Sequence, residues 1–169
     1  ASSRAARPMG ALLLPRRVEV GQVVVQAMDV RWPAGAGNTG EVAAVRVRVV
    51  PEHGSWQVQA AGGTVRPPGL PRMEVERVSA RLNDRTLFLT ETRLRCGDTG
   101  RVVASGDATL SASPRIDVTG EFQDVPVVEL VPGDWRARVR GAADGTFSFR
   151  RAAGRGVLEW RGRAAVTGG

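Results

Sequence analysis

The 169-residue chain has no lysine, no tyrosine, one histidine and a single cysteine. One cysteine excludes an internal disulfide and a zinc site built from four thiolates. No run of 18 apolar residues occurs, so the sequence offers no candidate transmembrane helix. The apolar run at 11–14 is too short for the core of a usual signal peptide. If the natural protein is exported or anchored, the responsible segment is therefore expected outside this sequence.

Common enzyme signatures are also missing, because no P-loop, G-x-S-x-G or H-E-x-x-H pattern occurs. His53 lies in the expected turn PEHG, and its neighbour Glu52 would point away from it on an extended chain. Cys96 ends an alternating segment and is interpreted as a small apolar core residue that shares a face with Leu94 and Phe88. A non-enzymatic protein is the favoured interpretation.

A group of acidic residues raises the question of a calcium site: Asp98, Asp107, Asp117, Glu121 and Asp124. The D-x-D-x-D-G loop that such a site needs is missing, and three of the five fall on the solvent side of expected strands. Solvation of turns and strands explains them better, so no metal and no other cofactor is expected.

All 24 basic residues are arginine, and the formal net charge is +7. The arginines are scattered along the chain, which favours solubilising strand positions over a nucleic-acid surface. The tryptophans Trp32, Trp56, Trp135 and Trp160 are dispersed too. They are more typical of the core or rim of a sheet than of base stacking, so nucleic acid is not an expected partner.

What the chain does contain is period-2 alternation of apolar and polar residues, in segments separated by Gly, Pro, Asn or Asp. Strands are expected at 22–32, 42–50, 55–60, 64–66, 73–82, 85–96, 102–110, 116–122, 136–140, 146–150 and 156–166. Gly62 and Gly63 are expected to form a bulge. The proline-bounded stretch at 125–133 is expected to be a short helix or crossover.

Short turns between consecutive strands imply antiparallel neighbours. A twisted sheet of about ten strands must curl, split or close. The expected fold is therefore all-β: a curved antiparallel meander that forms an open groove or a flattened barrel or sandwich. Gly106 and Gly120 are expected at bend points on its apolar face. Residues 1–17 are expected to be a flexible segment, and 18–169 a single β-domain that is a fragment of a longer protein.

The stretch ETRLRCGDTGRVVASGDATLSASPRIDVTGEF resembles the repeating units of the AsmA-like (AsmA/TamB) family of Gram-negative bacteria. The matching positions are Leu94, Gly97, Gly100, Val102, Ser105, Gly106, Leu110, Val118 and Gly120. WQVQAAGGTVRPPGLP and ADGTFSFRRAAGRGVLEWRGRAAVTGG are similar to further elements of that family, so the resemblance covers residues 18–169. The chain lacks the inner-membrane helix with which the family usually begins, which again suggests a piece of a longer protein.

The resemblance implies a periplasmic curved sheet whose apolar face holds lipid acyl chains. It also implies a role in phospholipid transport or envelope maintenance, and an inner-membrane anchor outside this chain. The expected lining is the apolar side of the strands: Val45, Val47, Val49, Trp56, Val58, Val78, Ala80, Leu82, Val102, Ala104, Leu110, Ile116, Val118 and Phe122. The alternative is a structural β-domain with a dry core. Its open sheet edges would pair with envelope proteins or with a second copy of the chain.

Overall fold

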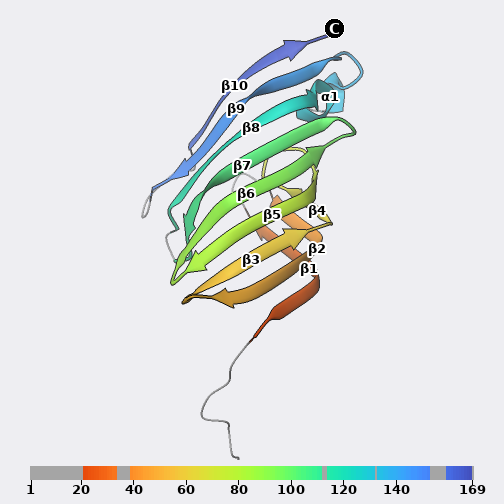
Figure 1. Ribbon diagram of the computed structural model, residues 1–169. Helices are drawn as coiled ribbons and strands as arrows, with labels where there is room; N and C mark the ends of the chain where they lie inside the picture. Colours follow the sequence, from red (N-terminus) through yellow and green to blue (C-terminus); the bar gives the residue numbers. More distant parts are fainter. Residues whose placement is uncertain (1–20, 34–38, 112–113, 132, 153–158, 169) are drawn as a thin grey trace, which may run out of the picture.

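The computed structural model describes residues 21–33, 39–111, 114–131, 133–152 and 159–168. Over these residues the chain forms one antiparallel ten-stranded sheet, which is not a closed barrel (Figure 1). The strands are β1 (Val23–Pro33), β2 (Thr39–Glu52), β3 (Ser55–Ala61), β4 (Thr64–Arg66), β5 (Met73–Asn83), β6 (Thr86–Cys96), β7 (Gly100–Thr109), β8 (Ile116–Pro126), β9 (Ala142–Arg151) and β10 (Glu159–Thr167). The expected all-β meander is confirmed, and it takes the open form.

The strand order follows the chain from β1 to β10, except that β3 and β4 share one position between β2 and β5. Gly62 and Gly63 separate these two strands as the expected bulge. The Gly62 amide donates to the Val75 carbonyl at 2.8 Å, and the Val75 amide donates to the Gly63 carbonyl at 3.1 Å. Gly63 has a φ of 66°, and a Cβ there would lie 2.3 Å from the Ala43 carbonyl oxygen. Glycine is therefore required for the sheet to continue past the bulge.

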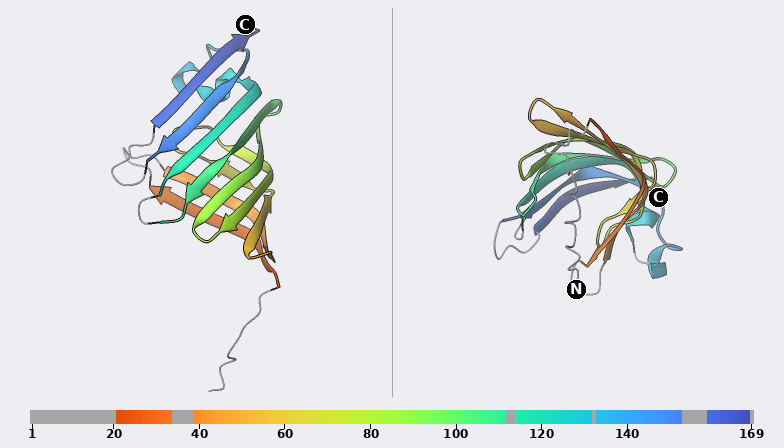
Figure 2. Two further views of the ribbon diagram at one scale, coloured as in Figure 1. Left: turned by 60° about the vertical axis from the view of Figure 1, so that its left-hand side comes forward. Right: turned by 90° about the horizontal axis from the view of Figure 1, so that it is seen from below.

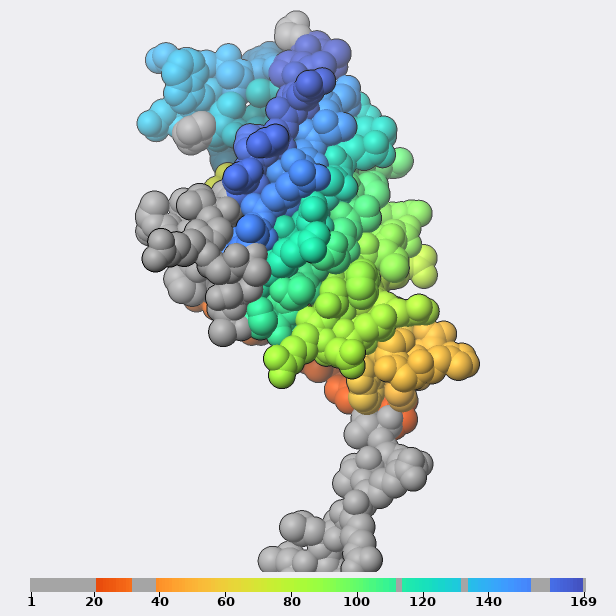
Figure 3. Space-filling model, turned by 90° about the vertical axis from the view of Figure 1, so that its left-hand side faces the viewer, coloured from red at the N-terminus to blue at the C-terminus, as the bar shows by residue number. Residues whose placement is uncertain are grey.

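The sheet is strongly curved. Seen from below, the strands bend into an arc with one hollow side (Figure 2). The short helix α1 (Val127–Leu130) and β4 both lie at the same end of the strands, the right-hand end in Figure 1. The space-filling view shows strands β5 to β10 following one another across the surface (Figure 3). The two sheet edges, β1 and β10, each pair with a single neighbour.

The expected strand at 136–140 is wrong. A 3-10 turn at Gly133–Trp135 is followed by turn and coil. The reason is that β8 and β9 pair directly with each other, beginning at Pro126 and Ala142, so no place in the sheet remains for the segment between them. The expected short helix near 125–133 is confirmed as α1. The segments at 1–17 and 156–158 lie outside the described residues.

Two clusters of buried side chains form the core. One contains Met73, Cys96, Val102 and Val125, and the other contains Val45, Val47 and Val75. Val65 and Leu94 pack against both clusters. Because β4 carries Val65 and pairs with both β2 and β5, the core lies at the end of the sheet where β4 and α1 are found.

Thr92 is the one buried polar residue among the described residues, and its Oγ1 has no hydrogen-bond partner there. Because an unpaired buried hydroxyl is costly, Thr92→Val is expected to stabilise the protein by about 1 kcal/mol. A higher urea midpoint at an unchanged m-value would show this. Thr90→Val is the matched control: the exposed Thr90 donates to the Ser79 carbonyl at 2.9 Å, so its loss should be neutral or slightly destabilising. A lower midpoint for Thr92→Val contradicts the interpretation.

Candidate functional site

Cross-strand pairing places mostly apolar residues, interrupted by Thr92 and three glycines, in rows that run across the whole sheet. Directly opposed residues of antiparallel strands share a face. One row runs from β1 to β10 through Val23, Val49, Val58, Ala80, Leu89, Gly106, Val118, Phe149 and Trp160. The next row contains Val25, Val47, Ala60, Val78, Thr92, Ala104, Gly120, Phe147 and Gly162. The face that carries these rows is the apolar face, and the opposite one is the polar face.

The register brings nearly all of the predicted lining residues onto this apolar face. Trp56 is opposite Leu82, and Phe122 is opposite Val102, which extends the face beyond the two rows. Leu110 is the exception. It lies just past the end of β7, its side chain is 53% exposed, and its amide donates to the Arg85 carbonyl at 2.6 Å.

The prediction that Cys96 shares a face with Leu94 and Phe88 is wrong for Phe88. The β6–β7 pairing shifts register between Leu89 and Thr92. This bulge places Phe88 on the polar face, where it is 41% exposed. A one-residue shift moves every following side chain to the other face of a strand.

The two ends of the apolar face differ in burial. At the end with β4 and α1, Val45, Cys96 and Val125 are 1–2% exposed. Toward the opposite end, Val58, Leu82, Ile116 and Val118 are only half-buried, while Trp56 is 37% and Trp160 58% exposed. Every strand of the described residues belongs to the one sheet, so no second sheet among them covers this open end.

Aromatic rings and glycines form complementary pairs on the apolar face of β8, β9 and β10. A Cβ on Gly120 would lie 2.5 Å from Cζ of Phe147, and one on Gly145 would lie 2.6 Å from Cζ of Phe122. Phe149 lies between Phe147 and Trp160, with ring centroids 5.5 and 6.5 Å away. Gly120 thus makes room for the Phe147 ring.

Sequence reasoning missed these aromatic residues, although their signal is present. Phe147 and Phe149 alternate with serine, and Trp160 begins the alternating stretch WRGR. Glycines on the same face, such as Gly120 and Gly162, interrupt the alternation of apolar and polar side chains. A glycine has no side chain, so the sequence does not mark its position as part of an apolar face.

The polar face carries the arginines, several of which are paired with acids. The side chain of Glu41 is 12% exposed. Its carboxylate forms ion pairs with Arg31 at 3.0 Å and with both Arg66 and Arg72 at 3.4 Å. The hydrogen bond from Arg31 lowers the pKa of Glu41, burial opposes that shift, and the three arginine charges lower it further. Arg31 on β1 and Arg66 on β4 lie opposite Glu41 on β2, so these ion pairs link neighbouring strands.

Cys96 is 1% exposed at the end of β6. Burial raises the pKa of its thiol to about 11, and the negative charge of Glu129 adds to the shift. The thiol is therefore neutral near pH 7, which fits a packing role rather than a nucleophilic one. His53 occupies an exposed turn with a φ of 45°, as expected from the sequence.

Stability is expected to fall by about 1 kcal/mol between pH 8.5 and 10, because the unfolded thiol ionises there while the folded thiol stays protonated. A raised folded pKa gives stability that is complete below the unfolded pKa and is lost as the pH rises toward 11. The chain has no lysine or tyrosine, so Cys96 is the only side chain expected to titrate in this window. Urea unfolding of Cys96→Ala should show a flat profile; an equal slope in both proteins would refute the assignment.

The acidic residues considered for calcium are dispersed over the sheet. Asp117 pairs with Arg150 at 3.3 Å, and the Asp124 amide donates to Asp144 at 2.8 Å in a bulge of β8. The described residues contain no cluster of three or more His, Cys, Asp or Glu side chains suited to a metal. Nor do they include a helix with the length and apolarity needed to cross a membrane.

Comparisons with protein-family models, curated proteins and solved structures gave no match to this chain.

Proposed function

We propose that this chain is a non-enzymatic, AsmA-like β-module that binds lipid acyl chains on its apolar face. The observation that carries the proposal is the continuity of that face from β1 to β10, together with its open end. Exposed apolar patches of this extent are uncommon on monomeric soluble proteins and usually mark a binding surface.

The expected driving force is the removal of acyl methylenes from water, about 0.8 kcal/mol for each buried CH₂. The half-buried side chains of Val58, Ile116 and Val118 can still gain contacts, whereas the buried end of the face is already packed. The acyl chain is therefore proposed to lie across the open end, between Trp56 on β3 and Trp160 on β10.

The resemblance to the AsmA-like family supports a periplasmic location and a role in phospholipid transport or envelope maintenance. An inner-membrane anchor outside this chain, and contacts with envelope proteins, belong to the same proposal. The resemblance rests on the glycine and apolar positions around 94–120, which form β6, β7 and β8 of the sheet.

Quenching of tryptophan fluorescence by dibrominated phosphatidylcholine tests the acyl-chain site directly. Variants that retain a single tryptophan separate the positions. Trp56 and Trp160, on the apolar face, are expected to lose most of their emission at saturating lipid. Trp135, in the 3-10 turn outside the sheet, should change little. Equal quenching of all three tryptophans, or none, would contradict the proposal.

The alternative function is pairing with another protein domain through a sheet edge. The observation that favours it is β10, which keeps an unbroken register with β9 from Glu159 to Thr167. An unbulged edge strand offers free backbone groups to an added strand. β1 is less suitable, because its pairing with β2 shifts register twice. Brominated lipid would not quench Trp56 if this function alone were correct.

A further inference from the structure

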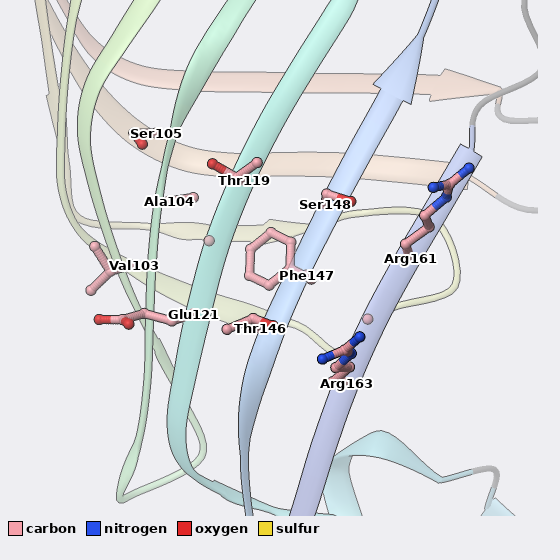
Figure 4. Close-up of a pocket in the computed structure, with 12 residues that line it drawn as sticks. Val103, Ala104, Ser105, Thr119, Glu121, Thr146, Phe147, Ser148, Arg161 and Arg163 are labelled. Carbon is pink, nitrogen blue, oxygen red and sulfur yellow. The ribbon is translucent and has the colours of Figure 1, made fainter.

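A second candidate site lies on the polar face, where strands β7 to β10 line a shallow, open hollow of about 630 Å³ (Figure 4). Two cross-strand rows of side chains border it. The first row is Val103, Glu121, Thr146 and Arg163, and the second is Ser105, Thr119, Ser148 and Arg161. The volume is within the range of roughly 300–1,000 Å³ for small-molecule sites.

The hollow exists because the row of residues along its middle turns its side chains to the opposite face of the sheet. Between the two bordering rows runs the row of Ala104, Gly120, Phe147 and Gly162, whose side chains belong to the apolar face. Their backbone therefore forms the floor on the polar side. Thr119, Thr146 and Ser148 border this floor on β8 and β9. Apart from the Phe147 ring of the middle row, the long side chains drawn in Figure 4 are Glu121 on β8 and Arg161 and Arg163 on β10.

The two ends of the hollow differ in charge. Arg161 and Arg163 lie on β10, two residues apart and on one face, so their Cα atoms are roughly 6.5 Å apart. Glu121 lies on β8, across the hollow from the arginines (Figure 4). Arg161 is 3.6 Å from Glu159, but both side chains are largely exposed, so this ion pair is weak and easily exchanged for another anion.

These groups match one kind of ligand. Guanidinium groups bind phosphate through charge-assisted hydrogen bonds. A carboxylate only accepts hydrogen bonds, while serine and threonine hydroxyls both donate and accept, which suits the hydroxyl groups of a polyol. The arginine end is therefore fitted to an anion, and the remainder of the hollow to a neutral chain of hydroxyls.

We propose that this hollow binds a phosphorylated polyol, with the phosphate on Arg161 and Arg163 and the hydroxyls on Glu121 and the serine and threonine side chains. Soluble sugar phosphates and phosphoinositide headgroups share this chemistry. The site is independent of the acyl-chain proposal, because it lies on the opposite face of the sheet and needs no apolar contact.

NMR titration of the ¹⁵N-labelled protein with myo-inositol 1-phosphate tests the site. Shifts should concentrate on β8, β9 and β10, and myo-inositol should bind at least fivefold more weakly. Arg161→Ala with Arg163→Ala should weaken binding at least tenfold. The matched control, Arg46→Ala with Arg48→Ala, removes a like pair from the polar face of β2 and should change affinity less than twofold.

Glu121→Gln should weaken inositol phosphate binding while leaving inorganic phosphate unaffected, which separates polyol recognition from simple charge attraction. Vesicles with phosphatidylinositol in phosphatidylcholine identify the source of the ligand. Arginine-dependent binding to these vesicles alone assigns a lipid headgroup, and binding of the soluble probe assigns a free sugar phosphate. Equal losses of affinity for the two double arginine variants would overturn the proposal. So would the absence of binding to both the soluble inositol phosphate and the vesicles. The soluble probe has no acyl chain, so its result does not depend on the apolar face.

Discussion

Replacing Gly106 with alanine is expected to destabilise the protein by about 4 kcal/mol, since backbone strain and steric overlap act together at this position. Gly106 has a φ of 155°, which side-chain-bearing residues rarely adopt. A Cβ there would lie 2.1 Å from the Asp117 carbonyl oxygen and 2.7 Å from the Val118 Cα. Both atoms belong to the backbone of β8, so β7 and β8 would have to separate to admit the methyl group.

Alanine substitutions at two other glycines separate the cost of backbone strain from the cost of steric overlap. Gly69 has a φ of 75° but nothing within 4 Å of a built Cβ, so Gly69→Ala should cost about 1 kcal/mol from backbone strain alone. Gly21 has open space and no positive φ, so Gly21→Ala should be neutral. Urea unfolding at constant pH measures all three. If Gly106→Ala is no worse than Gly69→Ala, the close approach of β8 is not what requires glycine.

The faces of the strands could be predicted because apolar and polar residues alternate along a strand with one apolar face, as at Val45, Val47 and Val49. Short loops then fixed which strands are neighbours. The bulges could not be predicted in the same way. Gly62 and Gly63 announce one bulge through residue type, but the shift between Leu89 and Thr92 has no such signal and moves Phe88 to the polar face.

Alternation also gives a wrong prediction where no partner strand is available. Arg136 to Arg140 alternates as well as other segments, yet it remains outside the sheet because β8 and β9 have already paired. A strand is defined by its partners, which a local pattern cannot supply. For the same reason a local pattern cannot predict whether the apolar face is open, because this depends on how far the whole sheet curves and whether its edges meet.

Introducing charge on the open end of the apolar face is expected to weaken acyl-chain binding about 100-fold. The variant is Val58→Glu with Val118→Glu, two half-buried positions in the same cross-strand row. Hydrated carboxylates there would keep three or four methylenes of the acyl chain in water. At about 0.8 kcal/mol for each methylene, this corresponds to roughly 3 kcal/mol, or about two orders of magnitude in affinity.

The matched control is Gln59→Glu with Gln123→Glu, which adds the same charge on the polar face of the same strands, opposite Arg48 and Arg101. Its lipid affinity should stay within twofold of the starting protein. Circular dichroism and urea unfolding confirm that both double variants remain folded, and quenching of Trp56 and Trp160 by dibrominated lipid measures their affinities. Equal affinities for the two double variants would show that lipid does not lie on the apolar face. The continuous valine and aromatic rows would then be explained better by a protein partner that covers them.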